Sequence, residues 1–206
     1  TRPMGRFAIL VIPVLAILDY QLTLAGAALA ERRYRKHFRI PSYELNPVMQ
    51  SVVAARKRVS ARHLALVALI TGLVYVEGLL MGFESSLFVF LLAFVFGAYA
   101  SVTGRHLANL LTFRFLEKHP NELSGTVEMS QAYVTRLSQY MYLSTILPLI
   151  AAAFFSPTPA VFGVAAGVLA LYVGHGLWYW RARKQDALRR ASGLTEPAQQ
   201  QTPPAA

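Results

Sequence analysis

The chain has 206 residues, of which 55% are hydrophobic and only 15% are charged. An average soluble domain carries about 25% charged residues, so this composition is typical of a helical membrane protein. The absence of cysteine excludes disulfides, thiolate catalysis and cysteine–zinc sites. The net charge of +10 would suit a nucleic-acid partner, but the basic residues cluster between the apolar segments, which is typical of membrane topology instead.

Five apolar segments approach the ~20 residues that a helix needs to cross ~30 Å of hydrocarbon. We therefore expect an all-α polytopic membrane protein, a bundle of about five transmembrane helices in one domain over residues 1–184. The predicted spans are about 7–30, 64–82, 87–104, 137–155 and 160–180. The third is expected to continue as a helix to about residue 115.

Two further segments are predicted from local sequence. Asn46-Pro47 is a good helix start, because Asn caps an N-terminus and Pro suits the first turn. Residues 48–58 then alternate in polarity as a short amphipathic helix does, so we expect it to lie on the membrane surface. Residues 191–206 are rich in Gln, Pro and Ala and are predicted to be a disordered tail.

The basic residues are distributed unevenly between the connections. All but two of the 20 Lys and Arg residues lie in 31–63, in 105–136 or after residue 180; the exceptions are Arg2 and Arg6. The positive-inside rule then predicts a cytoplasmic-membrane protein with its N-terminus outside and its C-terminus in the cytoplasm. The expected partners are the lipid bilayer and a membrane protein or a second copy, and no nucleic acid.

A cleavable signal peptide is the competing interpretation of the first segment. Arg2 and Arg6, the apolar stretch after them and the small residues 28–30 resemble one. Cleavage after Ala30 would leave the most basic connection outside, against the charge rule. We therefore expect the segment to remain as the first span.

Asp19 is the only charged residue within the first apolar segment. A carboxylate near the bilayer midplane is costly, so it marks either a functional site or a protonated group bonded to a neighbouring helix. Thr23 lies one turn further on the same face and could join Asp19 in binding a proton or cation. Glu77, in the second span, could line an outer vestibule with Asp19 or simply reach the membrane surface.

A second polar group is predicted at the cytoplasmic side. Arg105, His106 and Asn109 lie at the inner end of the third span, and Glu44 and Asn46 should lie at the same depth. His106 and Glu44 could act as acid and base, whereas two such ligands are too few to predict a metal site. The alternative is that these residues only mark the interface and cap helices. No cofactor is predicted.

Four short stretches resemble a family of small, uncharacterised, multi-span membrane proteins of prokaryotes. They are Leu18-Asp19-Tyr20-Gln21-Leu22-Thr23, Tyr43-Glu44-Leu45-Asn46-Pro47, Arg105-His106-Leu107-Ala108-Asn109 and Glu122-Leu123-Ser124-Gly125. The resemblance covers about residues 18–183 and implies no assigned activity. It does fall on the polar positions named above.

Three classes of function remain open from the sequence. The first is an ion, proton or small-solute pathway that uses Asp19 and Glu77. The second is an accessory or assembly subunit whose polar groups serve helix packing. The third is a membrane enzyme with a cytoplasmic-face site at Glu44, His106 and Asn109.

Overall fold

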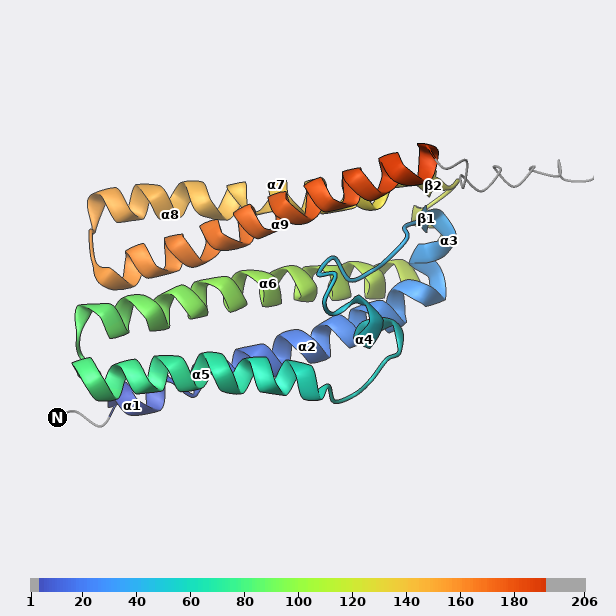
Figure 1. Ribbon diagram of the computed structural model, residues 1–206. Helices are drawn as coiled ribbons and strands as arrows, with labels where there is room; N and C mark the ends of the chain where they lie inside the picture. The colour runs from blue at the N-terminus through green and yellow to red at the C-terminus, as the bar shows by residue number, and fades with distance from the viewer. Residues whose placement is uncertain (1–3, 192–206) are drawn as a thin grey trace, which may run out of the picture.

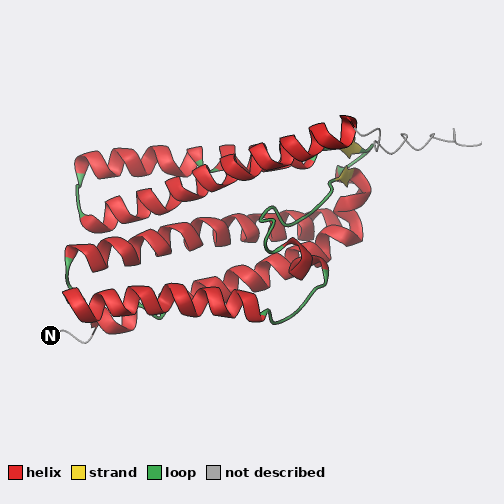
Figure 2. Cartoon of the chain, in the orientation of Figure 1, coloured by secondary structure: helices red, strands yellow, loops and turns green. Residues whose placement is uncertain are grey.

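The computed structural model describes residues 4–191, and most of them are helical (Figure 2). The longer helices are α2 (Val11–Leu29), α5 (Ala61–Met81), α6 (Ser86–Lys118), α7 (Gln131–Met141), α8 (Leu143–Phe155) and α9 (Pro159–Ala191). Shorter elements are α1 (Met4–Ala8), the π-helical η1 (Ala30–Tyr34), α3 (Arg35–His37), α4 (Gln50–Ala54) and the 3₁₀ helix η2 (Pro120–Glu122). Strands β1 (Phe38–Arg39) and β2 (Val127–Glu128) pair in parallel.

The prediction of five helices long and apolar enough to cross a membrane is confirmed, with α7 and α8 together forming the fourth. Several of these helices extend beyond the predicted spans. The first continues through η1 and α3 to His37, the third runs to Lys118, slightly past the expected end at about 115, and the fifth runs on to Ala191. The remainder of the predicted tail, 192–206, lies outside the described residues.

Serine caps explain why three of the helices begin where they do. A serine hydroxyl accepts a hydrogen bond from the backbone N–H three residues later and satisfies a donor that the first turn leaves unpaired. The three caps are Ser60 to His63 (3.3 Å), Ser85 to Phe88 (3.0 Å) and Ser130 to Tyr133 (3.1 Å). The first starts α5 three residues before the predicted span, and the third starts α7 six residues before it.

The predicted surface helix after Asn46-Pro47 is shorter than expected. The Asn46 carboxamide accepts from the Val48 N–H at 3.0 Å, which closes a turn, and the regular helix α4 covers only Gln50–Ala54. In the irregular stretch before α4, the side chains of Glu44 and Asn46 point into the bundle. We refer to residues 38–49 as the connecting segment.

Ala30 does not lie in an exposed, extended segment of the kind that proteases cleave. Ala30 is only 1% exposed, and it lies within the continuous helical run from α2 into η1. Retention of the first segment stays a prediction from the charge distribution.

Helix α6 lies between α2 and α9 in the bundle, while α5 covers one flank and α8 the other (Figure 1). Glycines bring α6 and α9 together. A Cβ on Gly97 would lie 2.7 Å from the Val164 carbonyl oxygen, and one on Gly163 would lie 2.8 Å from the Ala93 Cβ. The backbone of α6 lies equally close to Gly167, so the Gly163-x-x-x-Gly167 pair is a packing motif.

Large apolar side chains cover the outside of the bundle. Leu73, Leu80, Phe154 and Phe155 are all more than 60% exposed, whereas few large apolar residues are fully buried. An apolar surface of this extent is typical of a face that contacts lipid or other protein rather than water. Together with the five long apolar helices, it gives the chain the features of a multi-pass membrane protein.

The basic connections gather at one end of the bundle. The connection from α2 to α5, the connection from α6 to α7 and the C-terminal end of α9 all lie at this end, opposite α1 (Figure 1). Ion pairs join Arg32 to Glu117 (3.1 Å) and Glu31 to both Arg35 (3.7 Å) and Arg56. We refer to this end as the basic end.

The glycine contacts predict how the bundle responds to one added methyl group. Gly163→Ala and Gly167→Ala should each lose about 1–3 kcal/mol of stability, because the new methyl is forced against α6. The apparent melting temperature of the purified protein in detergent, followed by circular dichroism, measures this loss.

Gly174→Ala on the same helix is the matched control. A Cβ there meets no atom within 4 Å, so this variant should be as stable as the parent protein or more so. Equal effects at Gly163 and Gly174 would contradict the close packing of α6 on α9.

Candidate functional site

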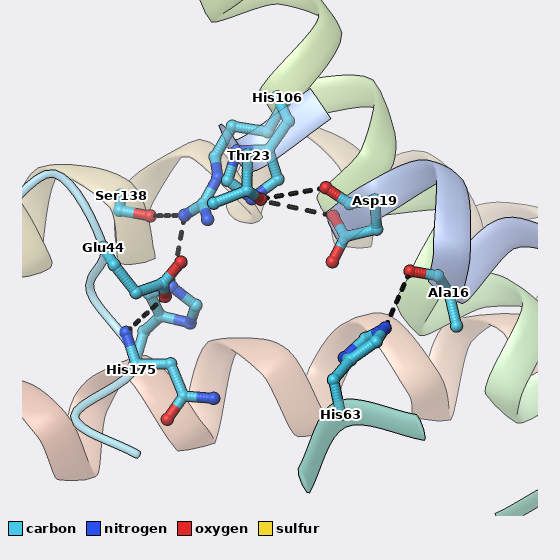
Figure 3. Close-up of polar contacts among 10 residues, drawn as sticks. Ala16, Asp19, Thr23, Glu44, His63, His106, Ser138 and His175 are labelled. Carbon is cyan, nitrogen blue, oxygen red and sulfur yellow. Dashed lines mark hydrogen bonds and ion pairs between the residues drawn. The ribbon is translucent and has the colours of Figure 1, made fainter. Parts of the chain in front are cut away.

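Polar side chains from four long helices and the connecting segment meet inside the bundle (Figure 3). Asp19 comes from α2, His63 from α5, Arg105 and His106 from α6, and His175 from α9. Glu44 and Asn46 reach them from the connecting segment. The structure thus brings Asp19, predicted to belong to one site, together with Glu44, Asn46, Arg105 and His106, predicted to belong to another.

Asp19 and His106 face one another, with the Asp19 Oδ1 atom 3.6 Å from the His106 Nε2 atom (Figure 3). Their side chains are 18% and 7% exposed, so little water competes for the contact. A carboxylate beside an imidazole can share or exchange a proton, as acid–base catalysts and proton carriers do. Thr23, in contrast, donates its hydroxyl to the Asp19 backbone carbonyl at 2.9 Å and is satisfied within its own helix.

Arg105 ties α6 to α7 and α9. Its guanidinium donates to the Ser138 hydroxyl and lies 3.2 Å from the His175 Nε2 atom. The other ring nitrogen of His175, Nδ1, lies 3.0 Å from the Leu171 carbonyl oxygen and must donate to it. His175 is therefore neutral, with its Nε2 lone pair accepting from Arg105.

The connecting segment holds Glu44 at the edge of this group. The Glu44 carboxylate accepts from the Asn46 N–H at 2.7 Å, and its backbone carbonyl accepts from Ser42 and Gln50, each at 3.0 Å. Burial raises the pKa of Glu44 above its ordinary value, against the smaller opposing effects of the Asn46 N–H and the Arg105 guanidinium. The neutral carboxyl is thus favoured more than it would be in water.

His63 fixes the level at which α5 begins against α2. Its Nε2 atom lies 3.1 Å from the Ala16 carbonyl oxygen, and its ring stacks on Tyr20 with centroids 4.7 Å apart. Asp19 lies between these two α2 residues, and so it is level with the first turn of α5. We expected Asp19 near the middle of the spans, but relative to α5 it lies close to the basic end.

These residues line one end of a central cavity of about 310 Å³. Most of its remaining wall is apolar and comes from the parts of α5, α6 and α9 that lie further from the basic end. Leu66, Ile70, Phe94, Val95, Val102 and Leu171 form these walls, and Trp178 borders the polar end. The cavity therefore combines a hydrocarbon-like compartment with a hydrogen-bonding one.

Two predicted residues lie elsewhere. Glu77 is about 21 Å along the axis of α5 from His63, at 1.5 Å rise per residue, and the Ser85 hydroxyl donates to it at 3.4 Å. Asn109 is absent from the cavity wall and lies beside the Tyr43 hydroxyl, where burial raises the Tyr43 pKa to about 12. Glu77 therefore lies far from Asp19, and the two residues do not line a common vestibule.

Other residues of this polar group have weaker signals in the sequence. His63 and Tyr20 on the cavity wall, and Ser138, which accepts from Arg105, are not among the predicted site residues. Within residues 4–191, no three His, Asp or Glu side chains are placed to hold a metal ion. Comparison with protein families, curated proteins and solved structures found no match.

The contacts of Arg105 predict a large effect of its removal. Arg105→Met should lower stability by about 1–3 kcal/mol, because Ser138 and His175 lose a charged donor within the bundle. Thermal unfolding in detergent tests this. Arg114→Met is the matched control on the same helix, since Arg114 is exposed; an equal loss in both variants would contradict the bridging role of Arg105.

The raised pKa of Glu44 predicts a pH-dependent stability. The folded protein holds this proton more tightly than the unfolded chain, so stability declines as pH rises above the ordinary value of 4.5. Glu44→Gln keeps an oxygen for the Asn46 N–H and should therefore be more stable than the parent at pH 8, with no advantage below pH 4.5. Melting temperatures across that range measure the difference, and a parent more stable than the variant at pH 8 would contradict it.

Proposed function

We propose that this chain is a multi-pass protein of the cytoplasmic membrane that binds a membrane-soluble amphiphile in its central cavity. The head of the ligand would lie against Asp19, Arg105 and His106, and its chain along the apolar walls. The orientation follows from the charge rule, with the basic end in the cytoplasm. The gathering of the basic connections at one end supports it (Figure 1).

The observation that carries this proposal is the two-part lining of the cavity. A pathway for ions needs polar groups along its length, whereas most of this wall is aliphatic or aromatic. A volume of about 310 Å³ is within the usual range for small-molecule sites, which are mostly apolar with a few placed polar groups. An amphiphile satisfies both compartments at once.

The polar end indicates an uncharged head. The Arg105 guanidinium is offset by two carboxyl groups, Asp19 and Glu44, on the same wall. A full negative charge would approach the two acids, and a full positive charge would approach the guanidinium. Hydroxyl or carbonyl oxygens can instead accept from Arg105 and bond with the His106 and Asp19 pair.

The enzyme hypothesis would use the same site, but with a different set of residues from the predicted one. His106 and Asp19 can move a proton to or from a bound head, with Glu44 on the same wall and Asn109 outside it. Binding is the part of the function that the cavity supports directly, and a reaction would follow from it.

Tryptophan fluorescence offers a direct test. The chain has two tryptophans, and Trp178 borders the cavity while Trp180 is 63% exposed. Trp180→Phe leaves Trp178 as the only reporter. A brominated long-chain alcohol should quench it saturably in phosphatidylcholine nanodiscs, and more strongly than the matching brominated carboxylic acid or amine.

Two further variants separate the cavity from the lipid surface. Val102→Phe fills the cavity wall and should weaken the quenching, whereas Leu107→Phe, on an exposed position of the same helix, should not. Quenching that rises without saturation, or that is equal in both variants, would show contact through the bilayer alone.

A proton pathway is the second candidate, because Asp19 and His106 form a contact of 3.6 Å that can exchange a proton. Asp19→Asn removes the titrating group while keeping its shape. In reconstituted vesicles the parent protein should then carry a pH-dependent flux that this variant loses. A flux that survives in Asp19→Asn, or no flux in the parent, would exclude the pathway.

A further inference from the structure

A second polar site lies outside the central cavity, between α7 and α9. The Arg136 guanidinium stacks on Tyr179, 4.2 Å from the ring centroid, and donates to the Gln139 amide oxygen at 2.7 Å. Arg183, one turn beyond, donates to the Tyr179 hydroxyl at 3.2 Å. Two arginines thus contact the same aromatic side chain.

Neither arginine is neutralised by a carboxylate nearby. Within residues 4–191, no Asp or Glu oxygen lies within 4.0 Å of Arg136 or Arg183. Both border a cavity of about 550 Å³ together with Tyr133, the α7 cap Ser130 and Asp186. Asp186 is the only acid on this wall, so the site keeps a net positive charge.

The site lies at the level where the apolar part of the bundle ends. Tyr179 is about 6 Å of helix rise beyond His175, towards the basic end. Trp178 and Trp180 flank it in the sequence, and Tyr133 and Tyr140 are exposed on α7. Tyrosine and tryptophan collect at the level of lipid headgroups, where an aromatic ring meets both hydrocarbon and water.

We propose that Arg136, Tyr179 and Arg183 form a binding site for the headgroup of an anionic phospholipid in the leaflet at the basic end. A guanidinium matches a phosphate in shape and charge, and the ring holds Arg136 in place before the lipid arrives. Basic pockets between helices near the membrane surface bind lipid headgroups in this way. This site shares no wall residue with the central cavity and is independent of the function proposed above.

Native mass spectrometry of the full chain in detergent, with phosphatidylglycerol or phosphatidylcholine added, tests the proposal. The parent protein should retain phosphatidylglycerol in preference. Arg136→Gln and Arg183→Gln should each weaken that binding about tenfold, because each removes a charge-assisted hydrogen bond to the phosphate. Asp186→Asn should strengthen it, because an opposing charge is removed.

Arg181→Gln is the matched control, with the same change of charge on an exposed position of the same helix. It should bind phosphatidylglycerol like the parent. Should Arg136→Gln fail to fold, Arg183→Gln decides the question, because that side chain is exposed. Equal binding of both lipids, an equal loss in Arg181→Gln, or displacement of the lipid by an equal concentration of inorganic phosphate would each overturn the assignment.

Discussion

The contacts of Arg105 organise the polar interior of this bundle. A guanidinium that is partly removed from water must be given acceptors, and it receives them from Ser138 of α7 and His175 of α9. Because Arg105 donates to the Nε2 atom of His175, the ring carries its proton on Nδ1 and donates it to the Leu171 carbonyl oxygen. The same charge moderates Glu44, whose burial alone would raise its pKa further.

The unequal lengths of the helices give this polar group its place. Helices α6 and α9 run well past the level at which α5 begins, and α2 continues past it through η1 and α3. The connecting segment fills the flank that α5 leaves open, and it inserts Glu44 and Asn46 there. The polar residues therefore gather near the basic end, and the cavity extends from them into the apolar part of the bundle.

Much of this fold could be predicted from the sequence, because long apolar runs admit few alternatives to membrane-crossing helices. Asp19, Arg105 and His106 were recognised because charged residues within apolar segments are costly. Their meeting in one site was not foreseen, since it depends on the level at which α5 packs against α2. His63 sets that level, and the only local signal was its place in the turn that Ser60 caps.

The surface of the bundle follows the same physical rule as its interior. Exposed apolar side chains cover the helices, and the aromatic residues around Tyr179 lie where the apolar part gives way to the basic end. The polar groups inside the apolar part include Thr23, which is bonded within its own helix, and the residues that gather at the cavity. The two proposed ligand sites thus lie at similar depth, one inside the bundle and one on its outer face.

The depth of Asp19 relative to the bilayer is the most direct test of this account. The chain has no cysteine, so a spin label at Gln21→Cys or Val14→Cys reports one exposed position on α2 at a time. In lipid vesicles, collision with oxygen and a water-soluble nickel complex should place the label at 21 at the interface and the label at 14 about 10 Å deeper. A label at 21 as deep as that at 14 would contradict a polar site close to the membrane surface.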